Sequence, residues 1–535
     1  DITIRGCGSR TRLLEPEEPT DPVIEMRDCQ NIAIRSLSVV AASVPGILLQ
    51  GDPKLPVERI VLEELELTCR DRSAVIGRGG RFISLLNNRV NVMQLAEALG
   101  DDATVGRQAA IFLTGEDLLM EENRIVASPG NGRMRTPFGG LHIGGGSNRV
   151  EVRRNLIEGG NGNGITLGSF RFVPAPQVDD FTNFTGIDAT PLFGLTLILG
   201  ENGCIHVDPN PPPPTGDDGE PLVPVADEGL REVRIVDNDI SRMGASGISV
   251  ARFFDLAAQP DFITVDRLTI EENRIRDCMR LELTEIPPTL REYSGYGGIA
   301  LADGEYLVIR SNSIEGNGSE QLSPICGVFI LHGEGIALDG NRILHNGRPA
   351  DPEVSSLPGQ RGGVIIGLAR PRTVPVAPFG SSFSGSRQDG VPAVRVHDNI
   401  VVSPEGRALK MFVVGPVTVE GNQLTAHGSN SLRRTPLPGA STGAAGFDVT
   451  NAAGVPYSVR SRTTNPLAAF LDVLGGAVVS IVNLGVSNEI YLQLIGLSGL
   501  GLVDRFSDPT GKDDDARLFA NGNILFNDNQ VVLDA

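Results

Sequence analysis

The chain has 535 residues and a formal net charge of −20 at neutral pH. This excess of negative charge argues against nucleic acid or an anionic membrane surface as a partner, because both repel an acidic protein. The 65 glycines and 36 prolines suit a β protein with many turns. Two uncharged runs near the C-terminus, 473–488 and 490–503, are shorter than the roughly 20 residues of a membrane-spanning helix, so no membrane span is expected.

A short pattern recurs along the chain. It is clearest in Val233–Met243, where apolar residues stand five and three positions before Asn238 and two positions after it. Three N-terminal copies keep the apolar positions but lack the asparagine, with Cys7, Leu37 and Leu65 at the central position. Such an internal repeat decides the architecture. The asparagines at the central position are Asn88, Asn123, Asn155, Asn238, Asn273, Asn312, Asn341, Asn399, Asn422 and Asn529.

Alternating apolar residues on each side of the central position indicate two short strands with one buried face. Asparagine tolerates a left-handed bend, which predicts that it forms the bend between them. An antiparallel hairpin is the alternative, but hairpin turns favour Asn-Gly or Asp-Gly, whereas other residues follow the asparagine here. The pattern therefore favours a corner within one coil, with coils stacked so that successive asparagines bond amide to amide.

A third strand of each coil begins with glycine followed by two apolar residues separated by one position. Uninterrupted copies of the repeat are 23 to 39 residues apart, which suits a coil of three strands with loops of variable length. The glycines that lead these strands are Gly46, Gly164, Gly247, Gly298, Gly327 and Gly363.

Together, the central asparagines and the glycine-led strands resemble the right-handed parallel β-helix of the pectate-lyase-like superfamily. The resemblance covers Ile2 to Val531 with interruptions, and it implies an all-β solenoid of about thirteen coils with an asparagine ladder. It says little about activity, because this fold hosts lyases, hydrolases, epimerases, tailspikes and non-catalytic adhesins.

In chain order, we expect the β-helix over 1–429, with a short helix within 87–110 and Pro-rich loop insertions at 169–229 and 370–392. Residues 430–523 lose the repeat and are predicted to form an irregular, apolar insertion or cap, and 524–535 form a final β-helix strand. No secretion signal is visible and the chain begins inside a repeat, so we expect a missing N-terminal segment and an extracellular or cell-surface protein.

Enzymes of the pectate-lyase-like superfamily generally bind substrate on the outer face of the glycine-led strand, so the resemblance points to that face. Its column has no carboxylate, whereas lyases of the family use an Arg or Lys base with acidic calcium ligands, and its galacturonan hydrolases use several Asp. We expect the two insertions or a neighbouring subunit to cover this apolar column, which argues against catalysis. Alternation gives the column as Leu48, Phe112, His142, Thr166, Ser249, Ala300, Phe329, Ile365 and Lys410.

One group of residues favours chemistry instead. Glu305 and Glu334 lie seven positions before consecutive central asparagines, and Asp303 and His332 lie nine positions before them. In stacked coils each pair is one rung apart, about 5 Å. Two carboxylates at this spacing can share a cation or act as a retaining glycosidase pair, and His332 can shuttle a proton beside Asp303. The alternative is that both segments are solvated turns.

Metal and thiol chemistry have weaker signals. The acidic pairs Asp179-Asp180 and Asp217-Asp218 in the first insertion are candidates for calcium binding or for plain solvation, and no other cofactor is expected. The six cysteines lack metal-ligand spacing. Cys7 and Cys29 are candidates for a disulfide, although buried free thiols are favoured.

The sequence therefore favours a non-catalytic β-helical scaffold or spike-like module, exported or surface-exposed, that recognises a partner protein or a glycan. Homo-oligomerisation is one way of covering its apolar column. The alternative is a polysaccharide lyase or glycoside hydrolase acting at Asp303, Glu305, His332 and Glu334. The absence of Trp and the presence of only five Tyr count modestly against a long glycan cleft, because sugars commonly stack on aromatic platforms.

Overall fold

The structure is a computed structural model. Its described residues form two compact units: unit 1 comprises Asp1–Val233, Ile248–Val265 and Leu281–Pro287, and unit 2 comprises Arg234–Gly247, Asp266–Arg280 and Pro288–Ala535. Regular structure in the described residues is all strand, and none of these residues belongs to a helix long and apolar enough to cross a membrane. The described residues are 2–18, 20–51, 55–96, 109–130, 134–174, 196–199, 205–208, 222–251, 263–281, 283–284, 295–349, 360–371, 373–375, 386–388, 390–404, 407–413, 416–427, 477–483, 490–492, 502–504, 517–519 and 524–534.

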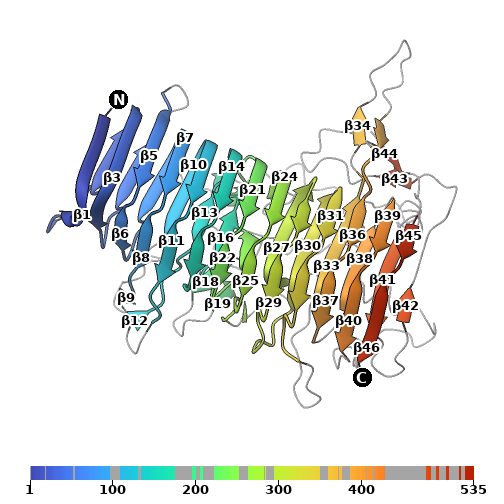
Figure 1. Ribbon diagram of the computed structural model, residues 1–535. Helices are drawn as coiled ribbons and strands as arrows, with labels where there is room; N and C mark the ends of the chain where they lie inside the picture. Colours follow the sequence, from blue (N-terminus) through green and yellow to red (C-terminus); the bar gives the residue numbers. More distant parts are fainter. Residues whose placement is uncertain are drawn as a thin grey trace, which may run out of the picture. The chain divides into compact units, whose positions relative to one another are not determined.

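Unit 1 is a stack of coils made of parallel strands, as predicted. Each coil has a leading face before the central position, a trailing face after it and a glycine face formed by the glycine-led strands; long strands continue around a bend from one face to the next (Figure 1). The strands of unit 1 are β1 (Ile2–Leu14), β2 (Ile24–Arg27), β3 (Gln30–Val40), β4 (Ile47–Gln50), β5 (Val57–Glu63), β6 (Glu66–Cys69), β7 (Val75–Leu86), β8 (Arg89–Val92), β10 (Ile111–Glu121), β11 (Arg124–Ala127), β13 (Leu141–Ile143), β14 (Asn148–Arg153), β15 (Leu156–Glu158), β16 (Ile165–Leu167) and β23 (Ile248–Val250), and β21 (Leu230–Val236) and β24 (Thr264–Glu271) have residues in both units.

Unit 2 repeats the same three faces. Its glycine face ends differently, because β41 (Ala477–Asn483) pairs with β38 in the antiparallel direction and β42 (Ile490–Leu492) pairs with β41. The parallel strands of unit 2 are β22 (Asp239–Ser241), β25 (Arg274–Arg276), β27 (Tyr296–Glu305), β28 (Val308–Arg310), β29 (Ser313–Glu315), β30 (Ile325–Glu334), β31 (Ile336–Asp339), β32 (Arg342–Leu344), β33 (Gly362–Arg370), β36 (Val394–His397), β37 (Ile400–Ser403), β38 (Arg407–Val413), β39 (Val417–Glu420), β40 (Gln423–His427), β45 (Ile524–Asn527) and β46 (Gln530–Asp534).

Apolar side chains on alternate residues of all three faces fill the interior of each unit. In unit 2, Ile309 on the leading face, Ile314 on the trailing face and Leu301 on the glycine face are each 0% exposed. The period of two residues therefore sends one side of every strand into a continuous core, as the repeat predicts.

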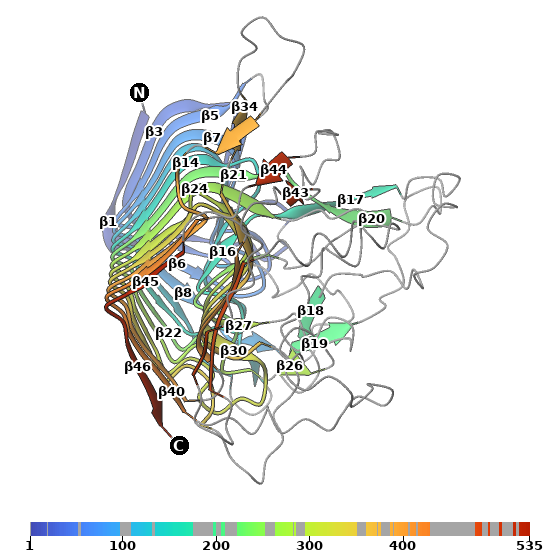
Figure 2. The same cartoon turned by 90° about the vertical axis from the view of Figure 1, so that its right-hand side faces the viewer.

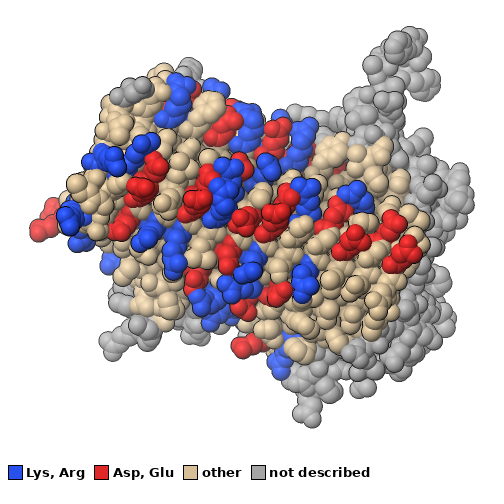
Figure 3. Space-filling view, viewed as in Figure 1, with Lys and Arg blue, Asp and Glu red and all other residues tan. Residues whose placement is uncertain are grey.

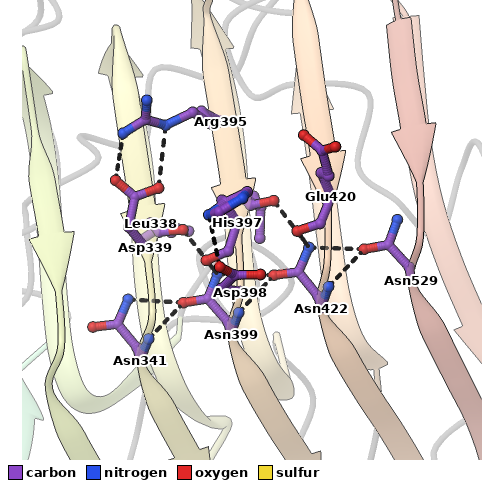
Figure 4. Close-up of polar contacts among 11 residues, drawn as sticks. Leu338, Asp339, Asn341, Arg395, His397, Asp398, Asn399, Glu420, Asn422 and Asn529 are labelled. Atoms are coloured by element: carbon purple, nitrogen blue, oxygen red, sulfur yellow. Dashed lines mark hydrogen bonds and ion pairs between the residues drawn. The ribbon is translucent and has the colours of Figure 1, made fainter.

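The asparagine ladder is present within each unit. In unit 1, Asn88 Nδ2 donates to Asn123 Oδ1 at 2.8 Å, and Asn123 Nδ2 donates to Asn155 Oδ1 at 3.0 Å. In unit 2 the same bond links successive central asparagines from Asn238 to Asn529 at 2.8–3.0 Å, and Figure 4 shows its last members. Because these amides are buried and fully used, they fix the register of neighbouring coils.

The bend at the central position differs from the prediction by one residue. The positive φ belongs to the residue before the asparagine, as at Asp237 (54°), Glu272 (57°) and Ser311 (55°). Among the described residues, the central asparagines are absent from the positive-φ group. The prediction that asparagine itself forms the left-handed bend is therefore wrong, and the ladder amide explains why asparagine recurs.

Charged side chains on the outward sides of the strands pair between neighbouring coils. Arg149 Nε lies 2.7 Å from Asp117 Oδ1 in unit 1, and Arg310 Nη2 lies 2.6 Å from Glu271 Oε1 in unit 2. Figure 3 shows the two signs of charge interspersed over this surface. Solvent screens such exposed pairs, so they matter more for neutralising the surface locally than for stability.

The segments outside the coils form small antiparallel pairs where they are described. In unit 1, the first insertion contributes β17 (Phe170–Pro174) with β20 (Leu222–Ala226), and β18 (Thr196–Leu199) with β19 (Ile205–Asp208), to which β26 (Leu283–Thr284) adds a parallel strand. In unit 2, β34 (Thr373–Pro375) pairs with β35 (Ser386–Gln388), and β43 (Leu502–Asp504) pairs with β44 (Arg517–Phe519). The helix expected within 87–110 is wrong for the described part, where β8 and β9 (Leu95–Ala96) are strands and β9 pairs with β12 (Met134–Arg135).

Candidate functional site

The four residues of the predicted acidic edge lie where β27 and β30 turn from the glycine face towards the leading face of unit 2. The two strands pair in parallel, with Asp303 opposite His332 and Glu305 opposite Glu334. Figure 2 views these strands along the stack. The structure therefore brings the four residues together in the predicted register, and their roles in chemistry stay a prediction. We call these four residues and Tyr306 the Asp303 bend.

Asp303 and His332 form a hydrogen-bonded pair. His332 Nδ1 lies 2.5 Å from Asp303 Oδ1, and the side chains are 17% and 7% exposed, respectively. An ionised carboxylate can only accept, so Nδ1 donates and carries a proton. The bond holds the imidazole in one orientation, which is what a histidine needs to present its other nitrogen to a ligand.

The two glutamates of the bend differ in exposure. Glu334 is 5% exposed, whereas Glu305, on the neighbouring rung, is half-buried. Glycines separate each glutamate from the Asp303–His332 pair, and a Cβ on Gly333 would lie 2.8 Å from Ile336 Cδ1. The bend is therefore tight at this point, and Glu305 is the more accessible of the two carboxylates.

Sequence reasoning missed an aromatic residue at the same bend. Tyr306 follows Glu305 directly, is half-buried and has a φ of 48°. The equivalent position on the next coil is Gly335, where an added Cβ would lie 3.5 Å from Tyr306 Cδ1. The phenol ring thus lies beside a residue without a side chain. The sequence could have indicated Tyr306 as a site residue, because it directly follows the predicted site residue Glu305.

The outward column of the glycine face is buried in unit 2. Ala300, Phe329 and Ile365 stand opposite one another on β27, β30 and β33 and are 0–1% exposed. Gly295, just before β27, lies so close that an added Cβ would be 2.6 Å from Phe329 Cδ2. At Phe329 this described contact comes from the segment before β27.

Lys410 continues this column on β38, opposite Ile365. It is 6% exposed, and its Nζ donates to Gln360 Oε1 at 2.7 Å. Nearby, Cys326 Sγ lies 3.2 Å from the Gln360 carbonyl oxygen, and burial raises the pKa of this thiol to about 12. The ammonium group is therefore part of a buried polar cluster and has little contact with solvent.

The column residues of unit 1 are more accessible. His142, Thr166 and Ser249 are aligned on β13, β16 and β23; the first two are half-buried and Ser249 is 2% exposed. His142 Nε2 donates to the Gly168 carbonyl oxygen at 2.6 Å, and its ring meets Phe112 edge-on with centroids 4.9 Å apart. Burial lowers the pKa of His142, and the hydrogen bond to Gly168 opposes that shift. This histidine is held to the backbone as a neutral group.

Metal binding finds no support in the described part of the chain. No group of three or more His, Cys, Asp and Glu side chains there could hold a metal ion. The predicted calcium residues Asp179, Asp180, Asp217 and Asp218 lie outside the described residues. The five described cysteines, Cys7, Cys29, Cys69, Cys278 and Cys326, are free thiols, so the candidate disulfide between Cys7 and Cys29 is not formed.

Comparison with known proteins identifies the fold. Residues 228–454 match the family described as the right handed beta helix region. The chain matches no curated protein. Similar solved structures include the A-module of the Azotobacter vinelandii mannuronan C-5 epimerase AlgE6 (11% identity, TM-score 0.28, covering 68% of this chain and 81% of that one). Another is the Dettilon tailspike protein (10% identity, TM-score 0.28, covering 75% and 59%).

The repeat, the parallel pairing of successive coils and the asparagine ladder all agree with the family match over residues 228–454. This chain is therefore a right-handed parallel β-helix protein.

Proposed function

We propose that the protein is a non-catalytic glycan-binding module that holds a neutral sugar chain against the Asp303 bend. One observation carries the proposal. The bend combines a hydrogen-bonded Asp303–His332 pair, 2.5 Å apart, with the half-buried ring of Tyr306 and the half-buried carboxylate of Glu305 on two neighbouring coils.

These groups match the surface of a pyranose. The faces of the sugar ring present C–H groups, which pack against the negative face of an aromatic ring such as Tyr306. Its hydroxyls are donors and acceptors, and a fixed imidazole and a carboxylate supply the complementary groups. Carboxylates also repel uronic acids, so the acidic surroundings of Tyr306 favour a neutral chain.

The burial of the acids favours binding over hydrolysis. A glycosidase places two carboxyl groups on either side of the scissile bond, so both must reach the substrate. Here Asp303 and Glu334 are buried, and of the three acids only Glu305 is half-buried. A sugar on this surface would meet one carboxylate, the imidazole edge and the phenol ring.

The test is a matched pair of substitutions at the same backbone position of adjacent coils. Tyr306→Asn removes the ring, and Arg267→Asn changes the equivalent residue one coil earlier, which also has a positive φ (56°). Asparagine tolerates this conformation, so both variants should fold. We expect Tyr306→Asn to weaken the binding of a neutral hexasaccharide such as cellohexaose at least tenfold, and Arg267→Asn to leave the affinity unchanged. Isothermal titration calorimetry measures both.

Equal affinities of the Tyr306→Asn and wild-type proteins for every neutral oligosaccharide tried would overturn the proposal. Preference for a galacturonate hexamer over cellohexaose would overturn the predicted ligand class.

A second candidate function is proton-transfer catalysis on a polysaccharide. The observation that favours it is the Asp303–His332 bond, because this carboxylate fixes the orientation of the imidazole, and a general base must be held in position beside the proton that it takes. Incubation with a panel of polysaccharides, followed by assays for new reducing ends and unsaturated products, tests it. Cleavage that is lost in both His332→Gln and Glu334→Gln would establish the lyase or hydrolase alternative and refute the non-catalytic one.

We further propose an extracellular or cell-surface location, where polysaccharides are available as ligands. The burial of Phe329 within one chain supports a module that does not need a second subunit over this part of the glycine face. A mass measurement in solution would test this: a stable homo-oligomer would contradict it.

A further inference from the structure

The corner between the glycine face and the leading face has the same backbone conformation in most of the described coils. The residue six positions before the central position has a left-handed backbone conformation, with positive φ, in nine coils of the described chain. Only two of these nine residues are aromatic. They are, with their φ values, Asn31 (58°), Arg59 (54°), Phe82 (53°), Asp117 (55°), Arg149 (54°), Glu232 (52°) and, in unit 2, Arg267 (56°), Tyr306 (48°) and Gly335 (65°).

Phe82 is an unusual residue for this position. A bulky side chain at positive φ is an outlier, because its Cβ crowds the backbone and destabilises this conformation. Burial of the ring would offset this cost, but Phe82 remains 44% exposed. Neither backbone preference nor core packing explains a phenylalanine here. An exposed aromatic ring held in a strained conformation is available for contact with another molecule.

Paired charges surround the ring. Arg81 lies over its face, with the guanidinium carbon 5.7 Å from the ring centroid. On the neighbouring strands Glu58 and Glu116 stand opposite Arg81, and Arg81 Nε is 3.5 Å from Glu116 Oε2. The arginine and glutamate of this pair are 47% and 42% exposed. The ring is therefore flanked by accessible donors and acceptors that carry charges of both signs.

The corner residues of the adjacent coils complete the surroundings. Arg59, one coil earlier, donates from Nε to Asn31 Oδ1 at 2.6 Å and pairs with Glu58. Asp117, one coil later, accepts from Arg149 Nε at 2.7 Å. These bonds hold the polar groups in place on both sides of the ring, so a ligand would meet a largely preorganised surface.

We propose that Phe82 is a second sugar-binding platform, in unit 1, which stacks on a neutral pyranose while the Arg81–Glu116 and Arg59–Glu58 pairs bond its hydroxyls. The ligand class rests on the function proposed for the Asp303 bend, but the location rests on Phe82 alone. A balanced set of charges selects neither an acidic nor a basic sugar, and the apolar ring selects a molecule with an exposed C–H face.

Because the chain has no tryptophan, the fluorescence of an introduced tryptophan can report ligand binding at each platform separately. Phe82→Trp places a single tryptophan at the proposed platform, and Tyr306→Trp places one at the Asp303 bend. Glu232→Trp is a control at an exposed residue with the same corner conformation. We expect cellohexaose to shift the emission of Phe82→Trp saturably, and to leave that of Glu232→Trp unchanged. Adding Tyr306→Asn to Phe82→Trp should leave its titration curve within twofold.

A second variant covers the case in which tryptophan disturbs the corner. Phe82→Asn should raise the unfolding midpoint, because asparagine tolerates the conformation, and should remove one of two cellohexaose sites in calorimetry. The inference would be overturned if cellohexaose did not change the emission of Phe82→Trp and if Phe82→Asn bound cellohexaose with the wild-type stoichiometry. A change in the emission of Tyr306→Trp in the same series would still support sugar binding at the Asp303 bend. A response of Phe82→Trp to a galacturonate hexamer alone would refute the neutral ligand.

Discussion

Gly327 and Ile343 occupy complementary space in unit 2: a Cβ on Gly327 would lie 2.1 Å from Cγ2 of Ile343. Ile343 follows the central asparagine Asn341 by two positions. The same relationship recurs in the two neighbouring coils, at 2.2 Å for Gly298 and Ile314 and at 2.0 Å for Gly363 and Val401. The glycine-led strands of unit 2 thus begin with glycine because the β-branched side chain of a trailing strand fills the place of its side chain.

This relationship predicts strong coupling between the two residues. Gly327→Ala should destabilise the protein by about 1–3 kcal/mol through overpacking, and Ile343→Ala by about 2–5 kcal/mol through the lost methyl groups. The double variant should cost less than the sum, because the new methyl group enters the space vacated by Ile343. Urea unfolding of the four proteins measures the coupling. Additive costs would show that the contact does not restrict this position to glycine.

The ladder amides predict a position-dependent loss of stability. Asn312 Nδ2 donates to Ile270 O and to Asn341 Oδ1, and its own Oδ1 accepts from Asn273 Nδ2, all at 2.9–3.0 Å. Asn312→Ala leaves several buried groups unsatisfied and should cost about 3 kcal/mol. Asn529→Ala, at the less buried end of the ladder, should cost about half as much, as judged from the denaturant midpoint. Equal losses at both positions would argue against a burial-dependent ladder.

The environment of His142 predicts a pH dependence of stability. Its folded-state pKa is lowered, mainly by burial, so the unfolded chain binds a proton more readily than the folded one. The stability that the neutral imidazole provides is present above its ordinary pKa of 6.5 and is lost as the pH falls through the folded value. The melting temperature should therefore decrease as the pH is lowered below about 6.5. His142→Gln keeps a donor for Gly168 but cannot titrate, and its melting temperature should fall less between pH 7.5 and 5.5.

The thiols predict selective labelling. Burial raises the pKa values of Cys69, Cys278 and Cys326 to about 12, whereas Cys7 is exposed. Iodoacetamide at pH 8 should alkylate Cys7 within minutes and leave the three buried thiols intact until urea is added, because the thiolate is the reactive form. Peptide mass spectrometry before and after unfolding reads the pattern. Rapid modification of Cys278 in the folded protein would contradict the closed core.

The repeat made the fold predictable, since the apolar period and the central asparagine are local signals that every coil carries. The error at Asn238 has a physical cause. Tolerance of a left-handed bend and the capacity to form a ladder are both properties of asparagine, and the sequence alone cannot separate them. The structure assigns the bend to Asp237, and Asn238 uses its amide to bond Asn273.

A second, shorter ladder escaped prediction. Asn317 Nδ2 donates to Asn346 Oδ1 at 2.7 Å, and both residues are buried. They follow their central asparagines by five positions and each precedes a glycine. This signal was present in two coils, too few to stand out as a period.

The candidate site was predictable only in part. The register placed Asp303 opposite His332 because strand pairing follows from the repeat, and the structure has that pairing. The contact of Gly295 with Phe329 depends on a segment outside the repeat, whose packing has no periodic signal. Tyr306 was missed because corner residues belong to neither strand pattern.

The ladder also separates distance in space from distance along the chain. Adjacent members can be 23 residues apart, as Asn399 and Asn422 are, or 107 apart, as Asn422 and Asn529 are, and the bond between them hardly changes: 2.9 and 2.8 Å. The geometry of the ladder therefore does not depend on the length of the chain that connects two of its asparagines. Loops can be exchanged, enlarged or grafted at these junctions while the framework keeps its order, so new binding specificities can be acquired by cassette replacement.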